Sequence, residues 1–181
     1  MSVAQAGAMT IAVADCHSPP KTAPGPLPAA TACPAPAVDT DAWIRVSDSA
    51  GVAYRLPPTF VERPDTTGAY RRWDGADGRP VVQIGFLRSP EHWLSVRRVP
   101  ALGMHEMSEC IDSIPAREML VQTWRMAGGA FRGGRRLDTY EVLALIPIEP
   151  GLTLLLYGGG PEREAQILLL AAARTVRVTV P

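Results

Sequence analysis

The side chains best suited to bind a metal ion are the histidines and acids between residues 91 and 109. The run His105-Glu106-Met107-Ser108-Glu109 begins like the helix of a zinc hydrolase, in which two histidines four residues apart reach one metal ion. Here the second of those positions is Glu109, and Pro100 and Pro115 leave room for only a short helix. The alternative interpretation of this run is a solvated polar face.

A looser metal site would draw on residues from the whole of this region. Its candidate ligands are His92, His105, Glu106 and Glu109. Each histidine has a glutamate beside it, but the two histidines lack the regular spacing that is typical of zinc sites. The alternative is two independent surface histidines, and the sequence predicts no cofactor.

Arginines gather around one glycine pair. Arg132, Arg135 and Arg136 flank Gly133-Gly134, so the sequence predicts an exposed basic loop. Guanidinium groups bind carboxylates and phosphates through paired hydrogen bonds, which makes these three arginines the candidate ligand-binding residues. The alternative is a solvated loop, because the chain has no net charge.

A second glycine run, Gly158-Gly159-Gly160, precedes a predicted helix and could hold an anion on free backbone N–H groups. It lacks the Lys-Ser/Thr pair of a P-loop and the GxGxxG pattern of dinucleotide sites. The alternative is backbone freedom where a strand turns into a helix. No Ser-His-Asp set and no pair of acids stands out as catalytic.

The charge balance bears on the partners. The chain has 18 basic and 18 acidic residues, so it lacks the basic surface that binds nucleic acids or anionic membranes. No stretch reaches the roughly 18 consecutive apolar residues of a membrane span. We expect the partner to be a protein or a small molecule.

The three cysteines are Cys16, Cys33 and Cys110. A disulfide between tail and domain requires an oxidising compartment and leaves one cysteine over; otherwise Cys110 is a buried, inert thiol. The small residues before Cys33 resemble those before the acylated cysteine of bacterial lipoproteins, which makes Cys33 a candidate lipid anchor. The prolines upstream disfavour an export signal. The sequence predicts a cytoplasmic protein as it stands, or a cell-envelope protein if translation starts elsewhere.

Composition divides the chain near residue 42. The first 40 residues hold seven prolines and three charged residues. Such a segment cannot bury enough apolar surface to offset the entropy of ordering it. The sequence predicts a disordered tail or degenerate export signal over residues 1–42, and one globular domain over residues 43–181.

Apolar residues alternate with polar ones through most of the domain, which predicts strands. The predicted strands cover residues 43–46, 52–56, 68–73, 80–87, 118–126, 139–148, 152–157 and 176–180. Residues 107–114 fit either a helix or a strand. The glycine pairs between residues 128 and 134 predict a mobile loop.

Residues 165–175 form the clearest predicted helix. Pro161 lies at its start, and Glu162 and Glu164 supply the acidic residues that helix N-termini favour. Hairpins followed by a closing helix are typical of the α+β class. The predicted architecture is an antiparallel sheet of six or seven strands flanked by helices, an α/β/α sandwich with a long C-terminal helix.

Three stretches resemble the PsbP-like α/β/α sandwich superfamily, which includes bacterial lipoproteins, a photosystem accessory protein and a nuclear-transport factor. They are Trp43–Pro58, a hairpin ending in Leu-Pro; Glu109–Ile114 with Ala116-Arg117 after it; and Leu152–Val178. The resemblance implies a seven-stranded antiparallel sheet between helices, with a strand over residues 109–114. It implies no chemistry, because the superfamily is mostly non-catalytic and a fold does not fix a function.

The sequence therefore predicts a non-enzymatic binding or accessory domain of unknown ligand, tethered by its N-terminal tail. The alternative is a small metal-dependent hydrolase that uses His92 and His105 with nearby glutamates. A third hypothesis is a structural protein that works by self-association.

Overall fold

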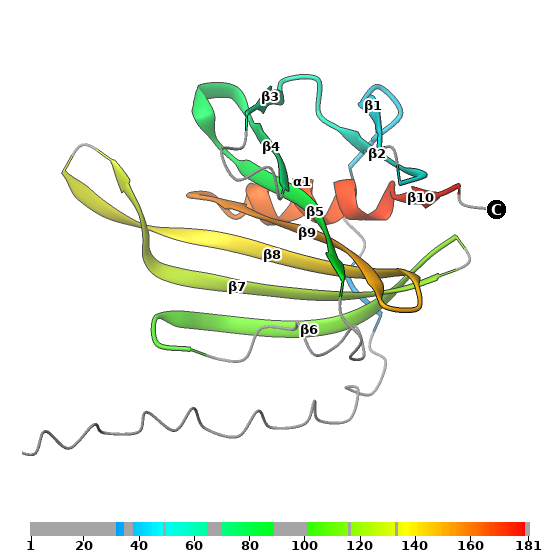
Figure 1. Ribbon diagram of the computed structural model, residues 1–181. Helices are drawn as coiled ribbons and strands as arrows, with labels where there is room; N and C mark the ends of the chain where they lie inside the picture. Colours follow the sequence, from blue (N-terminus) through cyan, green and yellow to red (C-terminus); the bar gives the residue numbers. More distant parts are fainter. Residues whose placement is uncertain are drawn as a thin grey trace, which may run out of the picture.

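The computed structural model describes residues 32–34, 38–48, 50–64, 70–88, 101–115, 117–132 and 134–179, without the side chains of residues 78 and 130–132. Within these ranges the chain forms ten strands, one α-helix and one short 3-10 turn, Ala76–Gly78 (Figure 1). No described helix has the length and apolar character needed to cross a membrane.

Seven strands build one antiparallel sheet in the order β3-β4-β5-β9-β8-β7-β6. Their bounds are β3 Val61–Arg63, β4 Tyr70–Asp74, β5 Val81–Arg88, β6 Met104–Ile114, β7 Arg117–Arg132, β8 Arg135–Glu149 and β9 Leu152–Gly160. Strand β9 lies between β5 and β8 and pairs with both along its whole length. This central position agrees with its almost wholly apolar sequence.

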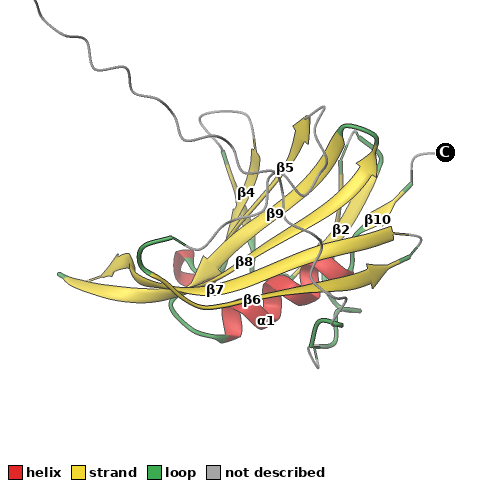
Figure 2. Ribbon diagram, turned by 90° about the horizontal axis from the view of Figure 1, so that it is seen from below, coloured by secondary structure: helices red, strands yellow, loops and turns green. Residues whose placement is uncertain are grey.

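A second layer covers one face of this sheet. It contains the helix α1, Glu164–Arg174, and a three-stranded sheet ordered β1-β2-β10, with bounds Ile44–Ser47, Val52–Leu56 and Arg177–Val178. Figure 2 shows α1 running across the large sheet, and Figure 1 shows the small sheet beside the C-terminal end of the helix. Both parts bury apolar side chains against the large sheet: Tyr54 and Leu56 of β2 and Leu169 of α1 lie in the main core cluster.

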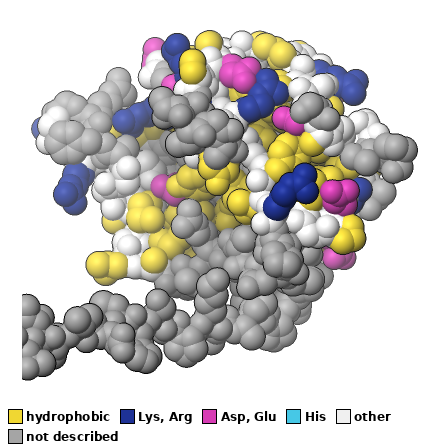
Figure 3. Space-filling view, in the orientation of Figure 1, with side chains coloured by type: hydrophobic (Ala, Val, Ile, Leu, Met, Phe, Trp, Pro, Cys, Tyr) yellow, Lys and Arg dark blue, Asp and Glu magenta, His cyan; other side chains and the backbone are white. Residues whose placement is uncertain are grey.

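The other face of the large sheet is also apolar. A smaller cluster contains Leu120 and Trp124 of β7 with Leu143 and Leu145 of β8, all at most 2% exposed. Its partly buried members come from β6, β7 and β9. In Figure 3 hydrophobic side chains gather near the middle of the visible face, with charged side chains around them. The central strands are therefore apolar on both faces.

The predicted α/β/α sandwich is wrong, although the predicted antiparallel sheet is present. The described residues are mostly β, with one 11-residue helix, and that helix shares its layer with a small sheet. Residues 107–114 form part of β6 because their side chains alternate: Cys110 packs against the main core and Ile111 against the second cluster.

The predicted loop between residues 128 and 134 is also wrong. Strands β7 and β8 continue through it, and Ala130 pairs with Leu137 and Arg132 with Arg135. The register shifts between Met126 and Ala130, where Gly128 has a φ of 65°. Glycines here allow a bulge within a long hairpin.

A candidate anion-binding pocket

Three arginines lie on one face of the small sheet. In the β1–β2 hairpin Arg45 is paired directly with Arg55, and in the β2–β10 pair Arg177 lies opposite Ala53. Alternation places Tyr54 of β2 on the other face, in the main core. Like charges directly opposite one another destabilise a sheet, so this face favours a negatively charged neighbour.

A pocket of about 360 Å³ opens between this arginine face and the end of α1. Its lining consists of Val38, Thr40, Asp41, Arg45, Ala53, Tyr54, Arg55, Ala171, Arg174, Thr175 and Arg177. Four arginines against one aspartate give the lining a positive charge. We call this the arginine pocket.

Hydrogen bonds fix Arg55 at one wall of the arginine pocket. Its Nη1 donates to the carbonyl oxygens of Thr40 at 3.0 Å and Asp41 at 3.3 Å, and to the Asp41 carboxylate at 3.2 Å. The backbone N–H of Arg55 donates to the Thr175 hydroxyl at 2.7 Å. These bonds hold residues 40 and 41, the small sheet and the end of α1 together around the pocket.

Arg174, on the last turn of α1, is held from the opposite side. Its Nε donates to the Asp112 carboxylate at 2.5 Å, and its Nη2 donates to the carbonyl oxygen of Cys33 at 3.1 Å. Arg177 donates from Nη1 to the carbonyl oxygens of Arg174 and Val176. Cations at this position also satisfy the carbonyl groups left open at a helix C-terminus.

Donor groups remain for a ligand. Arg45 is exposed and forms no hydrogen bond or ion pair with the part of the chain that the structure describes. Each guanidinium has five N–H groups, and the bonds of Arg177 use Nη1 alone. Carboxylates and phosphates accept paired N–H bonds of this kind. The arrangement is therefore suited to bind an anionic group.

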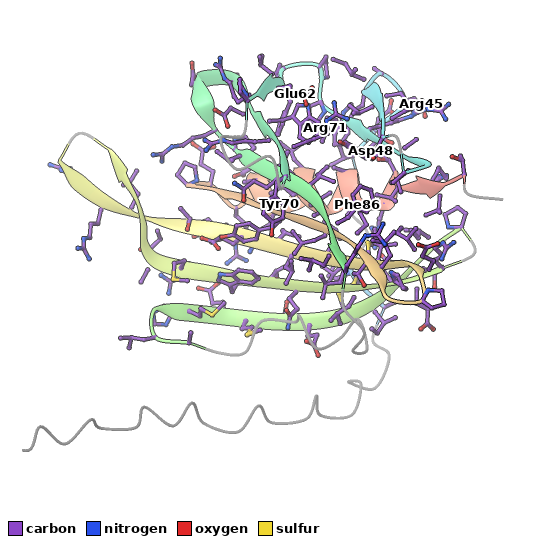
Figure 4. All side chains as sticks on the ribbon, viewed as in Figure 1. Arg45, Asp48, Glu62, Tyr70, Arg71 and Phe86 are labelled. Atoms are coloured by element: carbon purple, nitrogen blue, oxygen red, sulfur yellow. A yellow bond between two sulfur atoms is a disulfide. The ribbon has the colours of Figure 1, made fainter. Side chains whose placement is uncertain are left out.

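A polar cluster adjoins the other side of β2. Figure 4 shows Arg71 of β4 and Glu62 of β3 close to Asp48, which follows β1. Arg71 binds Glu62 through two bonds of 2.8 and 2.9 Å, and its guanidinium lies 4.8 Å from the centre of the Trp73 ring. The hydrogen bond from Arg71 lowers the pKa of Glu62.

The Tyr54 side chain reaches toward the same cluster from the core. Its ring meets Trp73 edge to face at 5.6 Å, and its hydroxyl is buried with no hydrogen-bond partner in the described structure. Burial raises the pKa of this hydroxyl. A buried hydroxyl without a partner costs folding free energy.

A disulfide joins Cys33 to Cys110 of β6, across 77 positions of sequence. Cys33 is 6% exposed and belongs to the main core cluster, and Ala32 forms a parallel bridge with Ile111. The interpretation of Cys110 as an inert thiol is therefore wrong. The predicted lipid anchor at Cys33 is also incompatible with this structure, because the same sulfur cannot form a thioether to a lipid.

The predicted metal ligands that the structure describes do not lie together. His92 lies outside those residues, and His105 is exposed on β6. Glu106 accepts hydrogen bonds from Arg125 at 2.9 Å and Arg163 at 2.7 Å.

The last candidate, Glu109, accepts a bond of 2.6 Å from the Gln122 amide. No group of three or more His, Cys, Asp or Glu side chains in the described ranges is arranged to hold a metal ion. With His92 undescribed, the metal site stays a prediction.

The predicted basic loop lies at the tip of the β7–β8 hairpin. Arg135 and Arg136 are exposed, and the backbone of Arg132 pairs with Arg135. Ligand binding by these three arginines stays a prediction.

The run Gly158-Gly159-Gly160 serves strand packing. All three residues belong to β9, which pairs with strands on both sides. A Cβ on Gly158 would lie 2.3 Å from the carbonyl oxygen of Val81. The interpretation as a loop of free N–H groups before a helix is therefore wrong.

The sequence does not predict the arginine pocket, although it predicts the two strands that carry Arg45 and Arg55. Arg45 and Arg55 lie in the strands predicted over residues 43–46 and 52–56, and pairing of these strands brings them near each other; the register that sets them directly opposite one another comes from the structure. Residues 40, 41 and 174 come from distant parts of the chain, and no local pattern connects them.

Comparisons with known proteins add no function. No protein-family model matches the chain, and no curated protein matches it significantly. A protein from Bacteroides thetaiotaomicron VPI-5482, whose crystal structure was solved at 1.50 Å, is similar at 10% identity with a TM-score of 0.45. The match covers 73% of this chain and 46% of that one, so the chain spans about half the length of that protein.

Proposed function

We propose that this chain is a non-enzymatic binding domain that takes the carboxylate or phosphate group of a ligand in the arginine pocket. The observation that carries the proposal is the direct pairing of Arg45 with Arg55 beside a cavity of about 360 Å³. Two guanidinium groups facing one another repel, and an anion between them converts that repulsion into two charge-assisted hydrogen bonds.

The arrangement around the pocket supports preorganisation. Arg55 and Arg174 are each held by bonds to residues far away in sequence, Asp41 and Asp112. A guanidinium that is already fixed loses less rotational freedom when it binds a ligand. Arg45, which is exposed, would close onto the anion last.

The test is calorimetric titration of the full chain with sodium phosphate, with sodium chloride at matched ionic strength as the reference. We expect phosphate to bind, and Arg45→Gln and Arg177→Gln each to weaken binding by about tenfold, since each removes a charge-assisted bond. Unchanged binding in both variants would refute the arginine pocket as the site.

Arg135→Gln is the matched control, because Arg135 is an exposed arginine on the predicted basic loop. It should leave phosphate binding unchanged. If Arg135→Gln weakens binding and Arg45→Gln does not, the hairpin tip is the binding site instead.

We further propose that the domain works outside the cytoplasm, held by its N-terminal segment. The Cys33–Cys110 disulfide supports an oxidising compartment, since such bonds rarely persist in the cytosol. The compartment can be tested by adding an alkylating agent when the native cells are lysed and then locating the alkylated cysteines. An alkylated Cys33 would show that its thiol was free in the cell, and would contradict the proposal.

A further inference from the structure

A second cavity lies on the opposite side of the large sheet from α1. It has a volume of about 180 Å³ and is lined by Val81, Gln83, Thr139, Glu141, Tyr157, Gly158 and Gly159. Among these side chains Glu141 is the one that carries a charge at neutral pH. The lining of this cavity is therefore negatively charged, whereas that of the arginine pocket is positively charged. The cavity is independent of the function proposed above.

The Glu141 carboxylate is held in a fixed position. One oxygen accepts a bond of 2.8 Å from the Thr139 hydroxyl, and the other accepts a bond of 2.7 Å from the Tyr157 hydroxyl. A carboxylate has about four acceptor positions, so two remain for another donor.

Gly159 makes room for this arrangement. It lies directly opposite Glu141 in the β8–β9 pair, and a Cβ at Gly159 would approach the Glu141 Cγ to 2.8 Å. The absent side chain thus lets Glu141 lie across β9 and reach Tyr157, two residues away on that strand.

Glu141 differs in its partners from the acids that pair with arginine. Six acids form ion pairs with arginine: Asp41, Glu62, Asp74, Glu106, Asp112 and Asp138. Glu141 forms no ion pair with any described residue, and its two side-chain partners are neutral hydroxyls. Within the described residues, no basic side chain therefore neutralises its negative charge.

The ring of Tyr157, which lines the cavity, lies beside the carboxylate, and the buried Trp124 supports this ring from behind. The rings of Trp124 and Tyr157 stack with centres 6.2 Å apart and planes 17° from parallel. Aromatic faces attract organic cations, and a carboxylate with open acceptor positions binds the N–H groups of an ammonium. A single carboxylate is too few charged ligands for a calcium or magnesium site.

We propose that this cavity binds the ammonium group of a small organic amine. The ammonium donates to the Glu141 carboxylate, and the aliphatic part of the amine lies along the sheet. A cavity of this volume limits the ligand to a short aliphatic chain.

The experiment titrates the full chain with n-butylammonium chloride, with n-butanol as a neutral probe of nearly equal shape, followed by NMR shifts of the Trp124 and Tyr157 rings. We expect n-butylammonium to bind and n-butanol to bind at least about tenfold more weakly. Equal binding of the two probes would overturn the proposal, because it would show that the charge is not recognised.

Variants locate the binding. Glu141→Gln keeps the shape and removes the charge, so it should abolish ammonium binding, whereas Glu62→Gln, which removes an acid paired with Arg71, should not. If Glu141→Gln fails to fold, Gln83→Arg offers a second test, since it places a competing cation in the cavity at a half-buried position. Retention of n-butylammonium binding in either Glu141→Gln or Gln83→Arg would refute the assignment.

Discussion

The backbone carbonyl of Cys33 accepts a hydrogen bond of 3.1 Å from the guanidinium of Arg174, although 141 positions separate the two residues. Cys33 is also bound covalently to Cys110, and Arg174 binds Asp112 on the same strand. The disulfide and the arginine pocket thus share one junction between the N-terminal segment, β6 and the end of α1.

Removing the disulfide is expected to destabilise the domain. The double variant Cys33→Ala/Cys110→Ala should lower the free energy of unfolding by roughly 2–5 kcal/mol, because the crosslink closes a long loop in the unfolded chain. Urea denaturation without reductant measures the change. Wild-type protein treated with dithiothreitol should reach the same midpoint, and an unchanged midpoint in the double variant would contradict a structural role for the bond.

Replacing Tyr54 with phenylalanine is expected to be harmless or stabilising at neutral pH. The hydroxyl has no hydrogen-bond partner in the described structure, so its removal takes away an unsatisfied buried group, with a gain of up to about 1 kcal/mol. Thermal and urea unfolding of Tyr54→Phe test this. A loss of more than about 1 kcal/mol would show that the hydroxyl has a partner, such as a buried water molecule.

The same tyrosine predicts a loss of stability in alkali. Burial raises the pKa of Tyr54 above its ordinary value of 10.0, so above pH 10 the unfolded chain loses this proton first. The titration of Tyr54 therefore leaves the free energy of unfolding unchanged below pH 10, and lowers it as the pH rises from 10 toward the folded pKa of Tyr54. Tyr54→Phe should lose less stability than wild type above pH 10, and parallel curves for the two proteins would refute the expectation.

Acid should weaken the contact between Glu62 and Arg71. The folded pKa of Glu62 lies below its ordinary value of 4.5, so the stabilisation is complete above pH 4.5 and is lost as the pH falls through the folded pKa. The stability of Glu62→Gln, measured by urea unfolding at a series of pH values, should approach that of wild type in this window. Glu149→Gln, which alters an exposed glutamate, is the control and should show no such convergence.

Adding a methyl group at Gly158 is expected to disrupt the centre of the sheet. Its Cβ would lie 2.3 Å from the Val81 carbonyl oxygen and 3.0 Å from Leu169, so a strand or the helix would have to move. We expect Gly158→Ala to lower the free energy of unfolding by several kcal/mol, of the order seen for overpacked cores.

Gly134→Ala is the comparison for that experiment. Gly134 has a positive φ of 78° but nothing within 4 Å of its Cβ position, so the cost should be about 1 kcal/mol of backbone strain. Equal losses at Gly134 and Gly158 would refute the packing explanation.

Local patterns predicted the strands well where residues alternate between two environments. The strand over residues 52–56 and the helix over residues 165–175 were predicted close to their observed bounds, since each depends on neighbours in sequence. β3 was missed because its three residues are all exposed and carry no alternation of burial. The long β7–β8 hairpin was cut short because glycines that form a bulge resemble those of a loop.

The candidate sites depend on contacts that no local pattern contains. The arginine pocket combines residues 40 and 41, the small sheet and the end of α1, and the position of Cys33 depends on the strand it crosses. The choice between helix and strand for residues 107–114 was open because Met107, Cys110, Ile111 and Ile114 fit both periods. Only the pairing with β7 decides it.

Strand β6 ends the seven-stranded sheet, and exposed sheet ends recruit strands from other molecules. Two features interrupt this one: Glu106 has a φ of 52° within the irregular stretch between His105 and Ser108, and Ala32 bridges Ile111 beside the disulfide. The crosslink therefore also keeps a template for intermolecular β-pairing occupied. Loss of the crosslink would make the protein prone to fibrous aggregation as well as to unfolding.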